Sequence, residues 1–223
     1  MCGRFALTAK TSDIENLVPA IKIKEEIKPR YNIAPTQKLA ALLNDGSMEL
    51  VNPRWGLIPS WSKDESIGVR MINARGETLN EKPAFKNLFR KRRCLIFANG
   101  FYEWKSENSG KHKTPYFIRL KSREVFAFAG LWDLFRKPDG ETICSATIIP
   151  CEPNALMAPI HNRMPVILGN DMLEEWMSTG KDATKLSDFI KPYDYEEMEA
   201  YPVSSQVGNP AFDNESCIIP RYN

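Results

Sequence analysis

The fold is decided by the stretch LIFANGFYEWK, residues 95–105. Two runs rich in β-branched and aromatic residues, 95–98 and 101–105, flank the dipeptide Asn99-Gly100. Such a dipeptide between apolar runs is typical of a tight turn that joins antiparallel strands. The stretch therefore predicts a pair of neighbouring strands with Glu103 in the second.

The same pattern continues on both sides of this stretch. The runs 38–43 and 48–54 flank Asn44-Asp45-Gly46, which is a strong hairpin signal. Further strands are expected over 115–120, 125–131 and 141–149, where β-branched and aromatic residues are frequent.

Helices are expected to be fewer and peripheral. Ser12-Asp13-Ile14-Glu15 has the form of a capping box, with Ile14, Leu17 and Val18 on one face. A second helix is expected over 86–93, after Pro83, with Phe85, Leu88 and Phe89 facing inward, and two more over 171–177 and 183–190. The sequence thus predicts an α+β fold in a single domain, residues 1–223, with an antiparallel, partly barrel-like β-sheet core.

Composition excludes several classes of protein. The net charge is only +2, although basic residues cluster locally at 22–30 and 86–93. Either basic cluster alone is more simply explained as a solvated helix face than as a nucleic-acid site. The five cysteines show no CxxC spacing, which argues against a disulfide framework or a zinc site and favours the reducing cytoplasm. We find no signal peptide and no apolar run near the roughly 20 residues of a membrane span.

Cys2 is the first candidate for chemistry. Removal of Met1 would leave Cys2 with an α-amine and a thiol on adjacent carbons. The unperturbed pKa of this amine is about 7.7–8.0, so roughly a quarter of the amine groups are neutral near pH 7.4. A neutral amine adds to an aldehyde to give a Schiff base. The neighbouring thiol can then close on the imine carbon as a five-membered thiazolidine.

Three polar residues are candidate partners for Cys2. Asn73, Glu103 and His161 each lie within or after an apolar stretch, as expected of side chains that strands deliver to a pocket. Each also has a structural explanation: a turn cap, a solvent-facing strand residue and a hydrogen-bonded core histidine. The only other histidine, His112, lies in a charged turn, so His161 is the one plausible imidazole acid or base.

Ordered blocks along nearly the whole chain resemble the SOS-response-associated peptidase family, or SRAP domain. The blocks are Met1-Cys2-Gly3-Arg4-Phe5 and residues 30–36, 54–61, 72–78, 93–96, 99–104, 161–166 and 202–209. Together they are specific, whereas any one alone would be weak. The resemblance implies binding of abasic sites in single-stranded DNA and at single-strand/double-strand junctions, and a thiazolidine crosslink that shields the lesion. We also expect no cofactor or metal, a monomer, and a cytoplasmic protein associated with the nucleoid when bound to DNA.

The resemblance also implies roles for individual residues. Cys2 matches the crosslinking nucleophile, and Asn73, Glu103 and His161 match the family's active-site residues. Arg4 and Arg75 match arginines near the DNA backbone, where forked donors suit phosphate. Four aromatic residues could stack on bases: Trp55, Trp61, Phe101 and Trp104. Packing in the core explains the presence of each of them equally well.

Two other functions stay open on the sequence. A cysteine peptidase fits the family name, and Cys2 would then cleave the bond after Met1 or other peptides. A single-strand binder without chemistry would use only the basic and aromatic residues. Adduct formation with abasic DNA and peptide turnover distinguish these functions.

Overall fold

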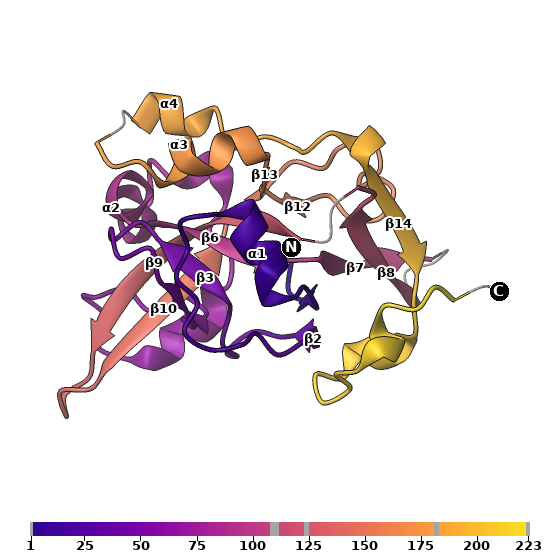
Figure 1. Cartoon of the computed structure of the whole chain (residues 1–223), viewed down its shortest axis with the longest axis horizontal. Helices are drawn as coiled ribbons and strands as arrows, with labels where there is room; N and C mark the ends of the chain where they lie inside the picture. Colours follow the sequence, from indigo (N-terminus) through magenta and orange to yellow (C-terminus); the bar gives the residue numbers. More distant parts are fainter. Residues whose placement is uncertain (1, 108–111, 123–124, 181–182, 222–223) are drawn as a thin grey trace.

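The structure, a computed structural model, describes residues 2–107, 112–122, 125–180 and 183–221. Its strands form two larger sheets and one two-stranded ribbon. Figure 1 shows α2 (Pro83–Lys91), α3 (Leu173–Met177) and α4 (Ala183–Ser187) gathered at one end of the molecule. β14 (Met198–Pro202) and the C-terminal segment lie at the other end (Figure 1). The strands between them confirm a single α+β domain with a curled, half-barrel sheet.

The seven-stranded sheet provides most of the core. Its order is β4 (Leu50–Val51), β3 (Ala41–Leu43), β6 (Arg93–Ala98), β9 (Phe126–Arg136), β10 (Thr142–Ile148) and β5 (Arg54–Trp55), with β13 (Ile167–Leu168) paired to β9. Every pairing is antiparallel except that of β5 with β10. All six residues of β6 are buried, as expected of a central strand covered on both faces.

The five-stranded sheet carries the start of the chain in its interior. Its order is β14, β8 (Lys113–Leu120), β7 (Gly100–Ser106), β1 (Phe5–Leu7) and β2 (Arg30–Ile33). β11 (Pro150–Cys151) and β12 (Met164–Pro165) form the separate ribbon. Because β1 lies between β7 and β2, the residues that precede it are held against the sheet.

The predicted tight turn at Asn99-Gly100 is wrong. β6 and β7 belong to different sheets, and the chain crosses from one to the other at Asn99. The Asn99 side chain accepts hydrogen bonds from the backbone N–H groups of Thr8 and Ala9. A Cβ atom at residue 100 would clash with the ring of Phe117 and lie 2.7 Å from the Ile118 carbonyl. Glycine is therefore needed here for close packing and not for turn geometry.

The other predicted strands are confirmed with changed bounds. β3 and β4 form the hairpin around Asn44-Asp45-Gly46, with Ala41 opposite Val51. The second predicted strand stops at Val51, and β5 leaves the hairpin to pair in parallel with β10. The strands predicted over 115–120, 125–131 and 141–149 correspond to β8, β9 and β10.

The helix bounds differ from those predicted, and the first helix has a different cap. α1 (Thr11–Leu17) begins before the predicted cap residue Ser12, and the backbone N–H of Lys10 donates to Asp13 at 2.8 Å. α2 begins and ends earlier than the predicted 86–93, and α3 begins later than the predicted residue 171. Phe85, Leu88 and Phe89 are buried on α2 as predicted. α4 ends at Ser187, before the predicted end. Short 3₁₀ turns complete the chain: η1 (Glu65–Arg70), η2 (Gly76–Thr78), η3 (Asn170–Met172), η4 (Tyr195–Glu197), η5 (Ser205–Gly208) and η6 (Glu215–Cys217).

The basic cluster at the end of α2 is partly structural. Arg93 is fully buried, and its guanidinium donates to four backbone carbonyls, including those of Phe89 and Trp176. Arg92 forms an ion pair with Asp133. These two arginines therefore hold α2 and α3 to the sheet. Among the described residues, no helix has the length and apolar character needed to cross a bilayer.

Candidate functional site

Cys2 is fixed by the strand that follows it. Phe5 of β1 is fully buried and packs edge-on against Trp55 and Phe128, with ring centroids 5.2 and 5.8 Å away. These contacts anchor the start of the chain in the core. Cys2 itself is fully buried, and its Sγ atom lies 3.9 Å from the Arg4 carbonyl oxygen.

Glu103 is brought to Cys2 by the register between β1 and β7. Phe5 lies opposite Phe101, and the Tyr102 N–H donates to the Arg4 carbonyl at 2.9 Å. The next residue of β7, Glu103, therefore lies beside the segment that begins with Cys2. Only 3% of Glu103 is exposed, and burial raises its carboxyl pKa to about 7. Burial, and after it the Glu103 charge, raises the pKa of the Cys2 thiol.

Asn73 reaches Cys2 from the other sheet. Residues 72–74 run beside β10: the Ala74 N–H donates to the Ile148 carbonyl at 2.9 Å, and the Ile148 N–H donates to that of Ile72. The Asn73 side-chain amide donates to the Cys2 carbonyl oxygen at 3.0 Å. Asn73 therefore fixes the backbone of Cys2 without contributing a charge.

His161 lies on the loop between β11 and β12. Its backbone N–H donates to the Met157 carbonyl at 2.8 Å. Its ring Nδ1 lies 3.1 Å from the Arg163 amide nitrogen and 3.2 Å from the Arg163 carbonyl, two contacts that need different tautomers. In either tautomer Nε2 faces Glu103, 3.9 Å from a carboxylate oxygen. Burial lowers the imidazole pKa, which favours the neutral ring at neutral pH.

The four predicted residues therefore meet at one place, although they come from four separate parts of the chain. The Cys2 carbonyl accepts a hydrogen bond from Asn73, and the charge of Glu103 helps to raise the pKa of the Cys2 thiol. Glu103 in turn faces His161. The cluster combines a thiol, a carboxyl group that titrates near neutrality, a neutral imidazole and an amide. Such a set can move protons around a covalent reaction at Cys2. The described residues contain no group of three or more His, Cys, Asp or Glu that could hold a metal ion.

A basic surface lies next to Asn73. Arg70, Arg75 and Lys82 are exposed and line a cavity of about 400 Å³ together with Asn73. Arg75 was predicted to face DNA, whereas Arg70, at the end of η1, and Lys82, the residue before α2, were not predicted because they lie outside any recognisable motif. Their position beside a site residue would favour a polyanion at this cavity.

Other predicted DNA contacts differ in exposure. Trp61 is 64% exposed and is free to stack on a base. Trp55 and Phe101 are fully buried, and the Trp55 indole N–H donates to the Ile72 carbonyl, so base stacking by these two rings is contradicted. Trp104 is half-buried, with the Arg4 guanidinium 6.0 Å from its ring centroid.

Arg4 is used mainly within the protein. Its Nη1 donates to the Asn32 side chain at 2.8 Å and to the Val207 carbonyl at 2.6 Å. A longer contact, 3.4 Å, joins Nη2 to the Gly208 carbonyl. The prediction that the Arg4 guanidinium donates to phosphate is therefore corrected, because most of its N–H donors bind acceptors within the protein.

An ion pair beside His161 was also not predicted from the sequence. Arg163 pairs with Glu77, the middle residue of η2, which follows Asn73 and Arg75 in the chain. Because the backbone of Arg163 contacts the imidazole, this pair holds the His161 loop to the Asn73 segment. No local pattern in the sequence joins residues 77 and 163.

Comparison with known proteins relates the chain to one group. The profile of "SOS response associated peptidase (SRAP)" matches residues 1–210. The chain is 46% identical over 214 residues to abasic site processing protein YoqW of Bacillus subtilis, covering 94% of this chain and 95% of the relative. It is 31% identical over 267 residues to abasic site processing protein HMCES of Xenopus tropicalis, covering 98% and 78%. A crystal structure of a Bacteroides thetaiotaomicron protein superposes with a TM-score of 0.88 at 25% identity, covering 99% of this chain and all of that one.

Proposed function

The chain belongs to the SRAP family, whose named relatives are abasic site processing proteins, and we propose that it captures abasic sites in single-stranded DNA through Cys2. The observation that carries this proposal is the placement of Cys2. Its carbonyl is held by Asn73, and its thiol lies within the electrostatic reach of Glu103. Removal of Met1 places a reactive amine at this position.

The proposed reaction joins both functional groups of Cys2 to one carbon. The α-nitrogen adds to the aldehyde carbon of the open deoxyribose, and the carbonyl oxygen takes a proton. Loss of this oxygen as water gives an imine. Sγ then bonds to the same carbon, the thiol proton leaves, and the nitrogen takes a proton. One aldehyde and one aminothiol thus become one thiazolidine and one water.

Glu103 is the proposed proton carrier at the nitrogen. A carboxylate accepts a proton from the Cys2 ammonium and returns one to the departing water. Its pKa, about 7, is close to the unperturbed amine value of about 7.7–8.0, so proton exchange between them is nearly balanced. An ordinary exposed glutamate would be a weaker acid–base partner at neutral pH.

His161 is the proposed acid–base group at the sugar. An abasic deoxyribose is mostly a closed hemiacetal, and ring opening moves a proton from the hydroxyl to the ring oxygen. A neutral imidazole can accept the proton that leaves the hydroxyl group and then donate a proton to the ring oxygen. The lowered pKa of His161 favours this neutral starting form.

The DNA is proposed to run past Asn73. Arg75, Arg70 and Lys82 would bind the phosphates of a single strand, and Trp61 would stack on a base or on the end of a duplex at a junction. Contacts of this kind do not read base sequence. We therefore expect binding by a monomer with little preference for the flanking bases.

A cysteine peptidase is the second candidate function, because the family description names a peptidase and the cluster offers a thiol, an imidazole and a carboxylate. A peptidase nucleophile must be a thiolate at neutral pH. Burial and the Glu103 charge raise the Cys2 thiol pKa, which opposes this. Aldehyde capture begins at the amine, so it is favoured. Self-cleavage after Met1 and removal by an aminopeptidase would both expose that amine.

The test uses three oligonucleotides of one sequence: undamaged, abasic, and carrying a tetrahydrofuran that mimics the abasic sugar without an aldehyde. We expect a band shift under denaturing conditions with the abasic strand alone and non-covalent binding to the tetrahydrofuran strand. Peptide turnover without any DNA adduct would instead support the peptidase. Non-covalent binding alone would indicate a single-strand binder.

A further inference from the structure

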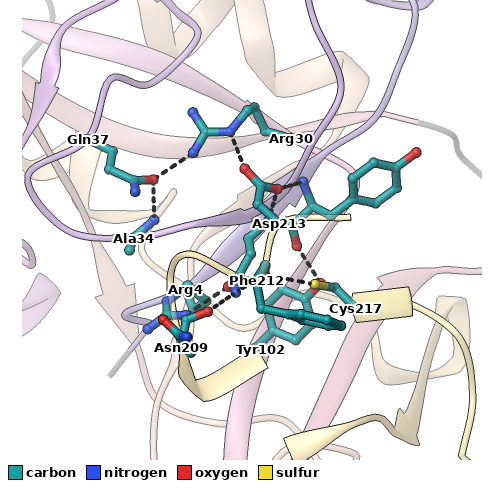
Figure 2. Close-up of polar contacts among 11 residues, drawn as sticks. Arg4, Arg30, Ala34, Gln37, Tyr102, Asn209, Phe212, Asp213 and Cys217 are labelled. Carbon is teal, nitrogen blue, oxygen red and sulfur yellow. Dashed lines mark hydrogen bonds and ion pairs between the residues drawn. The ribbon is translucent and has the colours of Figure 1, made fainter. Parts of the chain in front are cut away.

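A hydrogen-bonded network joins the C-terminal segment, residues 207–217, to β1 and β2 (Figure 2). Asp213 accepts from the backbone N–H groups of Tyr31 and Asn32, at 2.6 and 2.9 Å, and from Arg30 Nε at 2.5 Å. Figure 2 shows the Arg30 guanidinium between Asp213 and Gln37, whose side-chain oxygen it reaches at 2.8 Å. The segment thus pairs with β2, the outermost strand of its sheet, and protects that edge.

Asn32 is the centre of this network. It is fully buried, and its amide nitrogen lies within 3.1 Å of the carbonyl oxygens of Val207, Asn209 and Phe212. Its side-chain oxygen accepts from Arg4 at 2.8 Å. One amide therefore joins three carbonyls of the C-terminal segment to the guanidinium of Arg4.

The network reaches both reacting elements of the site. The Arg4 carbonyl accepts from the Tyr102 N–H at 2.9 Å, and the Tyr102 hydroxyl donates to the Tyr31 carbonyl at 2.6 Å. Arg4 lies two residues after Cys2, and Tyr102 directly precedes Glu103. The contacts of Asn32 with Arg4 and of Tyr31 with Tyr102 therefore hold β1 and β7 from the same strand, β2.

We infer that Asn32 is a positioning residue, through which the C-terminal segment holds Arg4 and so keeps Cys2 aligned with Glu103. The inference rests on the proposed function. It gives Arg4 a role in alignment that is independent of any contact with DNA. Misplacement of a reacting group by about 1 Å can slow a reaction on the order of a hundredfold, so loss of this amide should act on the reaction itself.

The test compares Asn32→Ala with Asn44→Ala. Asn44 is also a buried asparagine, and its side-chain oxygen accepts from the Arg93 N–H and the Trp132 indole, away from β1. Both variants should lower the melting temperature. Only Asn32→Ala should slow the first-order crosslinking step at saturating abasic DNA, by about tenfold or more. Its affinity for the tetrahydrofuran strand should change by less than about threefold.

A double-mutant cycle separates alignment from direct DNA contact. If Asn32 acts through Arg4, the slowing of the crosslinking step by Arg4→Ala and Asn32→Ala together should be close to that by Arg4→Ala alone. Slowing that multiplies in the double variant would overturn the inference. A crosslinking rate for Asn32→Ala within about twofold of the parent, or equal slowing by Asn44→Ala, would overturn it as well.

A milder variant, Asn32→Ser, answers the question if Asn32→Ala does not fold. If the parent forms no crosslink, the proposed function fails, and the alignment of Cys2 is then measured by its alkylation. Because Cys2 is fully buried, iodoacetamide should modify it several-fold faster in Asn32→Ser than in the parent, as mapped by peptide mass. Equal alkylation rates would overturn the inference separately.

Discussion

Two polar clusters share Arg4, whose guanidinium donates to Asn32 and whose carbonyl oxygen lies 3.9 Å from the Cys2 thiol, and they differ in the distances between their polar groups. In the network around Asn32, the ion pair and hydrogen bonds of Asp213 measure 2.5–2.9 Å. In the site, His161 and Glu103 face each other at 3.9 Å, and the Cys2 thiol lies 3.9 Å from its acceptor. Burial alone therefore does not distinguish a structural cluster from a functional one.

The difference lies in the hydrogen bonds and the ion pair of Asp213 and in the pKa shifts of the site. Asp213 accepts from the Tyr31 and Asn32 N–H groups and pairs with Arg30 at 2.5 Å. Burial of Glu103 instead raises its pKa to about 7, and burial of His161 lowers its pKa. A carboxyl and an imidazole whose pKa values are shifted in this way can exchange protons at neutral pH. Substitutions at Cys2, Glu103, His161 and Arg75, with matched controls, test these roles.

The largest effect is expected for Cys2→Ala, which should remove the stable adduct altogether. Deletion of one buried sulfur leaves a small cavity, so the fold should persist with a loss of about 1 kcal/mol. Cys2→Ser should give at most a labile imine or oxazolidine. Denaturing gels with the abasic strand measure the adduct, and circular dichroism checks the fold. A durable adduct in Cys2→Ala would place the attachment elsewhere.

Glu103→Gln should slow Schiff-base formation by about 10²–10⁴-fold, the range for loss of a general acid–base group. It should also stabilise the fold at pH 8, on the order of 1–3 kcal/mol. The pKa of Glu103 is raised to about 7 in the folded chain, so the unfolded chain loses this proton first. Stability therefore falls as pH rises from about 4.5 to about 7, a penalty that Gln lacks.

Single-turnover rates and melting temperatures at pH 5 and pH 8 measure both effects of Glu103→Gln. Asp213→Asn is the matched control, because it replaces one of the two oxygens that accept from Arg30 and from the Tyr31 and Asn32 N–H groups with an amide NH₂ group, which cannot accept. It should lower the melting temperature at pH 8, where Glu103→Gln raises it. The comparison between the clusters breaks if both variants shift the melting temperature in the same direction.

His161→Ala should slow crosslinking of the ring-closed abasic site by at least about tenfold, because ring opening loses its acid–base group. The defect should shrink on a substrate already held as an open aldehyde. Single-turnover rates on both substrates measure this. Equal defects on the two would remove the ring-opening role of His161.

The smallest effect is expected for Arg75→Ala. Loss of one phosphate contact should weaken binding for all sequences about equally and reduce the slope of log affinity against log salt by about 0.7. Titrations of the tetrahydrofuran strand at several salt concentrations measure the slope. Lys86→Ala on α2, an exposed lysine outside the cavity, is the control and should leave it unchanged. A strong preference for particular flanking bases would contradict backbone-dominated binding.

The sequence predicted the elements better than their arrangement. The apolar stripe Phe85, Leu88 and Phe89 correctly predicted the buried face of α2, because helix periodicity is local. The sheet crossover at Asn99-Gly100 was missed, because the partners of that dipeptide, Thr8, Ala9 and Phe117, lie far away in the sequence. A dipeptide typical of turns cannot reveal a contact of this range.

The resemblance to a family predicted which residues meet in the site, and the structure added how they are held. Asn73 was expected in the site as a partner of Cys2, and the structure shows its side-chain amide donating to the Cys2 carbonyl. Arg4 was expected near DNA, yet most of its donors go to Asn32 and the C-terminal segment. Position 32 carries no chemical signal in the sequence, since an asparagine in a strand has many ordinary uses.

Thiazolidine formation between the mature N-terminal Cys2 and an abasic site can be measured by intact mass. The purified chain is weighed before and after incubation with an abasic oligonucleotide, with Cys2→Ala and a variant retaining an extra residue before Cys2 as controls. We expect the parent to lack Met1 and to gain the mass of the oligonucleotide minus one water, without any reducing agent, and we expect the mass of neither control to change. An unchanged parent mass, or the same adduct in Cys2→Ala, would contradict this expectation.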